Sequence, residues 1–226
     1  MNIPYDLIRS KKRRRTISLL IKEDGGITVS VPYRTPDEEI ERFMEERKSW
    51  ICRKLSEKER LKKEAEKAFL PGEEFLFLGE WYPLAVEENG HREPPLKLSF
   101  GRFILNPDIA GEARNAFIEW YKKEAKEVIV NRAEIYSHRL QLFPMKIRIT
   151  NARCRWGSCS RDNCLALSWR MIMAPLSIID YVLMHEMAHL KEKNHSRRFW
   201  GYLESILPDY RERRFWLKKN GHLLHL

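Results

Sequence analysis

HEMAHL, residues 185–190, together with the histidine at position 195, is the stretch that decides what kind of domain this chain forms. On a helix, residues four apart lie on one face about 6 Å from each other, so His185 and His189 can reach one ion. In the HExxH pattern the two histidines bind zinc, and the glutamate serves as a general base instead of a ligand. The pattern predicts a metal-binding helix with Glu186 as the base.

Three side chains compete for the third metal position. His195 lies six residues beyond His189, and a continuous helix would turn it by about 600° and raise it by ~9 Å, away from the ion. The helix is therefore expected to end first, and Asn194 tolerates the left-handed conformation that ends helices. The spacing resembles the metzincin pattern, except that Glu192 stands where that pattern has glycine. Glu192 and Glu204 remain alternative carboxylate ligands, and His195 is favoured because neutral imidazole suits zinc.

The residues before the motif argue against an ordinary surface helix. The segment IIDYVLM at 178–184 is almost entirely apolar, whereas a solvated helix would carry charges there. Histidine and glutamate side chains on a half-buried helix need partners, and a metal ion supplies one. A structural metal site without catalysis is the alternative.

The composition is that of a globular protein, with 43% hydrophobic and 11% aromatic residues among 226. This length allows one large domain or two small ones. No segment approaches the ~20 apolar residues of a membrane-spanning helix, and no early stretch resembles a signal peptide. The four cysteines, at 52, 154, 159 and 164, are expected to be reduced thiols. These features predict a cytoplasmic protein that does not associate with a membrane.

The net charge of +10 comes from 42 Lys and Arg against 32 Asp and Glu. Basic residues gather at 11–15 (KKRRR), Arg197-Arg198, Arg211, Arg213-Arg214 and Lys218-Lys219. Such clusters can bind phosphate backbones or anionic substrates. They are more often solvated strand edges and helix faces. Nucleic acid is therefore kept as an alternative partner, and the oligomeric state is left open.

Residues 1–107 are predicted to form an N-terminal, antiparallel β-rich region with one long helix. Strands are expected at 5–8, 16–21 and 27–31 and, as a second set, between 75 and 105. The runs 16–21 and 27–31 should pair as a hairpin. The helix begins at Thr35-Pro36 and continues through a segment rich in Lys and Glu.

Residues 108–226 are predicted to form the metal-binding catalytic domain, packed with the first region into one compact unit. Helix is expected from 108 to about 142, strands at 145–150 and 164–169, then the metal helix and two further amphipathic helices after Ser196. Long helices with small sheets place the whole chain in the α+β class.

Several runs resemble the YgjP-like metallopeptidase family. They are RWGSCS at 155–160, LSWRMIMAP at 167–175, IDYV at 179–182, HEMAHL at 185–190, NHS at 194–196, FW at 199–200 and PDY at 208–210, joined by RRTI at 14–17, VP at 31–32 and WI at 50–51. The resemblance spans nearly the whole chain. It implies a compact zincin-like domain, with zinc carried by His185, His189 and His195 and with Glu186 as base.

The leading hypothesis is a zinc-dependent peptidase that acts on a peptide or protein. Three histidines leave a fourth zinc position for water, whose pKa the metal can lower to about 7. Glu186 would accept the proton of this water and pass it to the leaving amine. The strand at 164–170 is expected to pair with an extended substrate, and Arg170, Tyr181 or Tyr210 to stabilise the oxyanion.

Two alternative functions remain. One is a nucleic-acid-associated protein, which includes a protease that acts on DNA-bound proteins. The other is an inactive, metal-stabilised scaffold.

Overall fold

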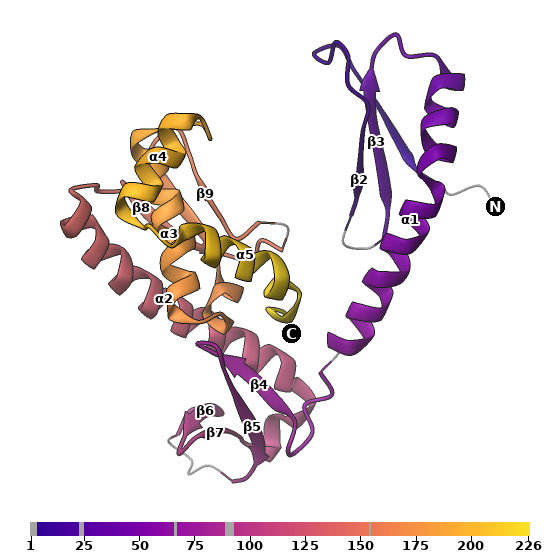
Figure 1. The fold of residues 1–226 in the computed structure, drawn as a ribbon. Helices are drawn as coiled ribbons and strands as arrows, with labels where there is room; N and C mark the ends of the chain where they lie inside the picture. The colour runs from indigo at the N-terminus through magenta and orange to yellow at the C-terminus, as the bar shows by residue number, and fades with distance from the viewer. Residues whose placement is uncertain (1–3, 23–24, 66, 89–92, 154) are drawn as a thin grey trace. The chain divides into compact units, whose positions relative to one another are not determined.

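The computed structural model describes residues 4–22, 25–65, 67–88, 93–153 and 155–226 (Figure 1). Helices and small sheets alternate along the chain, which confirms the predicted α+β class. The chain divides into two compact units, Met1–Glu66 and Lys67–Leu226. Each unit is described by itself.

The first unit is a three-stranded sheet covered by one long helix. Its elements are β1 (Asp6–Ser10), β2 (Ser18–Ile21), β3 (Ile27–Pro32) and α1 (Asp37–Ala65). The central strand β3 pairs parallel with β1 and antiparallel with β2, so the predicted hairpin of β2 and β3 is confirmed. Val29 and Val31 of β3 are fully buried together with Ile51 of α1. This apolar layer holds the helix on the sheet.

The second unit begins with a four-stranded sheet and a long helix. These elements are β4 (Glu74–Phe77), β5 (Glu80–Val86), β6 (Leu96–Ser99), β7 (Arg102–Leu105), a 3₁₀ turn η1 (Pro107–Glu112) and α2 (Ala113–Leu140). The strand order is β4-β5-β7-β6. The remaining elements are β8 (Lys146–Thr150), β9 (Gly157–Cys159), β10 (Cys164–Ser168), η2 (Trp169–Met173), α3 (Leu176–Lys191), α4 (Arg197–Ile206), α5 (Tyr210–Asn220) and η3 (Gly221–Leu223).

Helix α2 joins the four-stranded sheet to the elements around α3. Its buried residues recur every four positions, at Phe117, Tyr121, Ala125, Ile129 and Ala133, and all five are fully inaccessible to solvent. This spacing places them in one stripe along the helix. A single core therefore runs through the whole of this unit.

The first two residues of this stripe contact different parts of the unit. The Phe117 ring stacks on Phe75 of β4 at 4.1 Å, and the Tyr121 ring stacks on Trp169 of η2 at 6.0 Å. The Tyr121 hydroxyl donates a hydrogen bond to the Leu76 carbonyl at 2.8 Å. Buried residues between 75 and 105 share this core, and the second compact unit accordingly begins at Lys67.

Two contacts fix the start of α3, the helix that carries His185 and His189. Arg132 of α2 donates to both carboxylate oxygens of Asp180, at 2.7 and 2.5 Å. The turn between β4 and β5 passes so close that a Cβ on Gly79 would lie 2.8 Å from the Pro175 ring. Gly79 has φ of +90°, a conformation that favours glycine. Helix α3 is thus anchored to both α2 and the four-stranded sheet.

The structure also bears on membrane-spanning helices and on the state of the cysteines. In the described part of the chain, no helix is long and apolar enough to cross a membrane. The cysteines at 52, 159 and 164 are free thiols. Cys154 lies outside the described residues.

Candidate metal centre

Helix α3 places His185 and His189 on one face, with ring centroids 5.2 Å apart. The helix ends at Lys191, and Glu192 leaves it in an extended conformation with φ −123° and ψ 101°. The prediction that Asn194 adopts a left-handed conformation is wrong, because Asn194 is not among the residues with positive φ. The chain instead turns away three residues after His189, which is early enough to bring His195 back toward the pair.

The start of the next helix holds His195 in place. Ser196 is the N-cap of α4, and its hydroxyl accepts a hydrogen bond from the Phe199 backbone N–H at 3.4 Å. Phe199 is fully buried, and its ring stacks on His189 at 4.5 Å with an interplanar angle of 27°. The cap and this aromatic contact together fix where His195 lies relative to α3.

The three histidine rings converge. The Nε2 atoms of His185 and His195 are 2.9 Å apart, and one ring nitrogen from each of the three residues lies within 4.8 Å of the others. Donor atoms bound at ~2.0–2.1 Å around a tetrahedral ion are roughly 3.3 Å apart. The spacing therefore fits three ligands of a single zinc ion with small adjustments.

The protonation of the rings also fits a metal. Burial, with smaller contributions from His189, His195 and Arg214, lowers the pKa of His185 to about 3. Burial also lowers the pKa of His195, followed by the effect of His189. Neutral imidazole is the form that binds a metal, so these rings are ready to coordinate at neutral pH.

Hydrogen bonding around the rings points the same way. His189 Nδ1 donates to the Glu192 carbonyl at 2.9 Å, which leaves its Nε2 lone pair available. His185 turns its Nε2 toward His195, and its Nδ1 is buried with no hydrogen-bond partner among the described residues.

The two alternative carboxylate ligands do not belong to the cluster of possible metal ligands. The Glu204 carboxylate pairs with Arg211 at 3.3 Å, and Glu192 contacts His189 through its backbone carbonyl. Among the described residues, the cluster that can hold an ion consists of His185, His189 and His195. The structure thus brings His195 to the pair of histidines, as the sequence analysis favoured.

Glu186 lies buried beside this cluster, with 7% of its surface exposed. A Cβ on Gly157 of β9 would lie 2.6 Å from Glu186 Cγ and 2.7 Å from its Oε1, so only glycine leaves room for this carboxylate. Burial raises the pKa of Glu186 to about 7, against a lowering effect of Arg155. A carboxyl group with that pKa can both accept and release a proton near neutral pH.

The predicted substrate strand at 164–170 is wrong. Strand β10 is the centre of its sheet, paired parallel with β8 and antiparallel with β9, so both of its edges are used. A substrate can pair only with an edge strand. The edge strand next to the base is β9, which carries Gly157 and pairs with β10 on one side.

The three candidates for oxyanion stabilisation have different surroundings. Arg170 is buried, lies over the Trp169 ring and donates to Asn151 Oδ1 at 3.0 Å. The ring of Tyr181 lies 6.0 Å from that of His185. The hydroxyl of Tyr210 accepts a hydrogen bond from Arg211 Nε at 3.1 Å. Tyr181 is the candidate with a direct contact to a histidine of the cluster.

Three residues at this site were not predicted from the sequence. Trp200 was quoted only within the FW run at 199–200, yet its ring stacks on His195 at 5.5 Å and 24°. Gly157 was quoted only as part of a family run. Arg214 lies over the Trp200 ring at 5.0 Å, and no local pattern indicates this, because only the packing of α5 brings it there. The FW pair three residues after the N-cap Ser196 is the one signal that could have indicated Trp200.

Comparisons with known proteins place the chain in a family. Residues 15–220 match the family described as YgjP-like, metallopeptidase domain. Among solved structures, the metallopeptidase zymogen of Pyrococcus abyssi abylysin is 23% identical, with 40% of this chain and 93% of that chain covered and a TM-score of 0.36. This structural similarity is too low to support an argument about the site, and no curated protein matches the chain. The family match spans most of the sequence, and the chain therefore belongs to the YgjP-like metallopeptidase family.

Proposed function

We propose that this protein is a zinc-dependent peptidase in which His185, His189 and His195 hold the metal and Glu186 is the general base. The observation that carries the proposal is the convergence of three histidine rings beside a buried carboxylate whose pKa is about 7. When bound, zinc would polarise a water molecule and the scissile carbonyl.

Glu186 has the protonation behaviour that peptide hydrolysis requires. As a carboxylate it would accept the proton of the attacking water, and as a carboxylic acid it would deliver that proton to the leaving amine. Burial keeps it close to the point where both forms are accessible. The backbone of Gly157 passes close to the Glu186 side chain, because a Cβ there would lie 2.7 Å from Glu186 Oε1. This close contact would hold the carboxylate in one position.

The surrounding residues would position the peptide. Strand β9 offers an edge next to Glu186, along which an extended substrate could add as a further strand. Burial is the largest cause of the raised pKa of the Tyr181 hydroxyl, so this group stays protonated and can donate a hydrogen bond to the developing oxyanion. These contacts would be made with the substrate backbone and thus do not depend on its side chains.

The experiment that tests this proposal is removal and return of the metal. The chelated protein should lose hydrolysis of an unfolded protein substrate, and one equivalent of zinc should restore it. His195→Ala should bind zinc at least tenfold more weakly than wild type, because it removes a ligand. Glu192→Ala is the matched control on the same connection and should bind zinc as wild type does. The reverse order would assign the third position to a carboxylate.

Two further assignments belong to this proposal. We infer a cytoplasmic location, which the free thiols at 52, 159 and 164 support. Nucleic-acid binding remains a second candidate function, because Lys11, Lys12, Arg14 and Arg15 are all exposed in the connection between β1 and β2. It would add a partner to the peptidase without changing its chemistry.

A further inference from the structure

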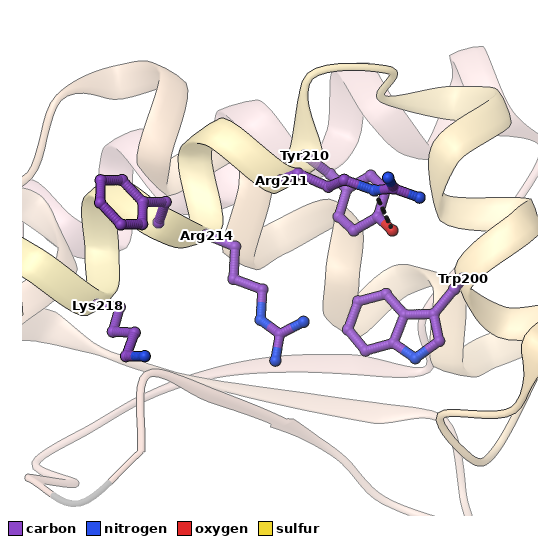
Figure 2. A pocket seen from close by; sticks show the side chains of 6 residues that line it. Trp200, Tyr210, Arg211, Arg214 and Lys218 are labelled. Atoms are coloured by element: carbon purple, nitrogen blue, oxygen red, sulfur yellow. Dashed lines mark hydrogen bonds between the residues drawn. The ribbon is translucent and has the colours of Figure 1, made fainter.

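A cavity of about 550 Å³ lies between helices α4 and α5 of the second unit. Its lining consists of three aromatic and three basic residues: Trp200, Tyr210, Arg211, Arg214, Phe215 and Lys218. Figure 2 shows that Arg214 and Lys218 extend from α5 to the same side, with the Arg214 guanidinium between Lys218 and the Trp200 ring. No acidic residue lines the cavity.

The three cations of the cavity differ in their partners. Arg211 is partly neutralised, since it pairs with Glu204 at 3.3 Å and donates to the Tyr210 hydroxyl. Arg214 contacts the Trp200 ring at 5.0 Å. Within the described ranges, neither Arg214 nor Lys218 forms an ion pair with a carboxylate. The cavity therefore holds two positive charges that no acidic group of the described chain balances.

The cavity adjoins the proposed metal site through one shared ring. The Trp200 ring stacks on His195 at 5.5 Å and on Tyr210 at 5.6 Å. A group bound in this cavity would therefore lie one aromatic ring away from the scissile bond of a substrate held at the histidines.

We propose that this cavity binds a carboxylate of the peptide substrate and so directs cleavage to acidic segments or to chain ends. The inference rests on the proposed peptidase function. The carboxylate of an acidic side chain, or of a C-terminus, could pair with Arg214 and Lys218 at the rim of the aromatic lining. A lysine or arginine in the same place would be repelled by those charges. Because the cavity adjoins the metal ligands, a peptide is favoured over nucleic acid as its occupant.

Cleavage of matched peptides tests the preference. The peptides differ at one position near the scissile bond, which is Glu, Gln or Lys, and each is made with a free or an amidated C-terminus. We expect kcat/KM of the wild type to be roughly tenfold higher for Glu than for Gln, and lowest for Lys. A preference that follows the free C-terminus would identify the terminal carboxylate as the bound group, whereas one that follows Glu would identify the side chain. Equal values for all peptides would overturn the proposal.

Substitutions in α5 test whether the cavity sets the preference for a Glu peptide. Lys218→Ser should reduce the Glu-to-Gln ratio, and Lys218→Glu should invert it so that the Lys peptide is favoured. Lys219→Ser is the control, because it removes the same charge from the next, exposed residue, which does not line the cavity. An equal change in Lys219→Ser would show that net charge, and not the cavity, sets the preference.

A binding measurement separates this inference from the proposed activity. Labelled Glu, Gln and Lys peptides and a single-stranded DNA oligomer are titrated into the full chain carrying Glu186→Gln, with fluorescence anisotropy as the readout. Tighter binding of the Glu peptide, lost in the double variant with Lys218→Glu, supports the proposal. Binding of DNA alone that is lost with Lys218→Glu overturns it and assigns the cavity to nucleic acid. If the wild type cleaves no peptide, the peptidase proposal fails. The ratio of Glu-peptide to Gln-peptide affinity then decides on its own whether the cavity binds a carboxylate.

Discussion

Replacing Gly157 by alanine should impair catalysis by displacing the base. The added Cβ would lie 2.6, 2.7 and 2.9 Å from Cγ, Oε1 and Cδ of Glu186, well inside the ~3.5–4.0 Å of ordinary carbon contacts. Glu186 is buried, so its side chain cannot swing into solvent without leaving the site. A misplacement of roughly 1 Å at a reacting group can cost about 10²-fold in rate. Overpacking of this kind costs about 1–3 kcal/mol of stability.

The assay for Gly157→Ala combines three measurements on the same preparation. Hydrolysis of a quenched fluorescent peptide should fall about 10²-fold, zinc content should stay at the wild-type level, and chemical denaturation gives the stability change. Gly201→Ala is the matched control, because a Cβ at Gly201 in α4 has no atom within 4 Å. This control should be as active as wild type and more stable by roughly 0.5–1 kcal/mol. Wild-type activity in Gly157→Ala would refute the claim that Gly157 positions Glu186.

Three further outcomes follow from the same structure. In the metal-free protein, burial raises the pKa of Glu186 from 4.5 to about 7. The resulting contribution to stability is fully present below pH 4.5 and is lost as the pH rises through 7. The stability of Glu186→Gln relative to wild type should therefore be about 1–3 kcal/mol higher at pH 8 than at pH 4. Equal differences at both pH values, measured by urea denaturation, would contradict the buried carboxylate. Arg132→Met should destabilise the protein by roughly 2–4 kcal/mol, because it leaves the buried Asp180 carboxylate unpaired. As a control, Lys126→Met removes an exposed cation from the same helix and should change stability by less than about 0.5 kcal/mol. Replacing KKRRR at 11–15 by serines should weaken DNA binding equally on all sequences and flatten its salt dependence, and an absence of DNA binding by the wild type at low salt would leave these residues as a solvated surface.

The three-histidine cluster could be predicted from the sequence because its arrangement is mostly local. His185 and His189 are fixed by helical periodicity, and His195 requires only that the helix end soon after. The place of that end was wrong, since the chain leaves the helix at Glu192 without a left-handed residue at Asn194. Helix ends depend on what the following segment packs against, and here that is the docking of α4 through Phe199.

Features that depend on packing between distant segments could not be predicted. The unit boundary at residue 66 follows from the burial of Phe75 against α2, which no periodicity indicates. The choice of β9 over β10 as the edge strand follows from the pairing of β10 with β8. Gly157 and Arg214 reach the site from 29 residues before and 28 residues after Glu186. Their roles become visible only when the chain is folded.

The measurement that tests the central claim most directly compares the zinc-loaded wild type with zinc-loaded Glu186→Gln on an unfolded protein substrate. The substitution keeps the size of the side chain and removes its ability to take a proton, while the histidines that would hold the metal are unchanged. Both proteins should contain one equivalent of zinc, and hydrolysis by Glu186→Gln should be ~10²- to 10⁴-fold slower, as expected for loss of a general base. Glu134→Gln, an exposed acid on α2, controls for the loss of a carboxylate and should be as active as wild type. Hydrolysis by Glu186→Gln at the wild-type rate would contradict the assignment of Glu186 as the base.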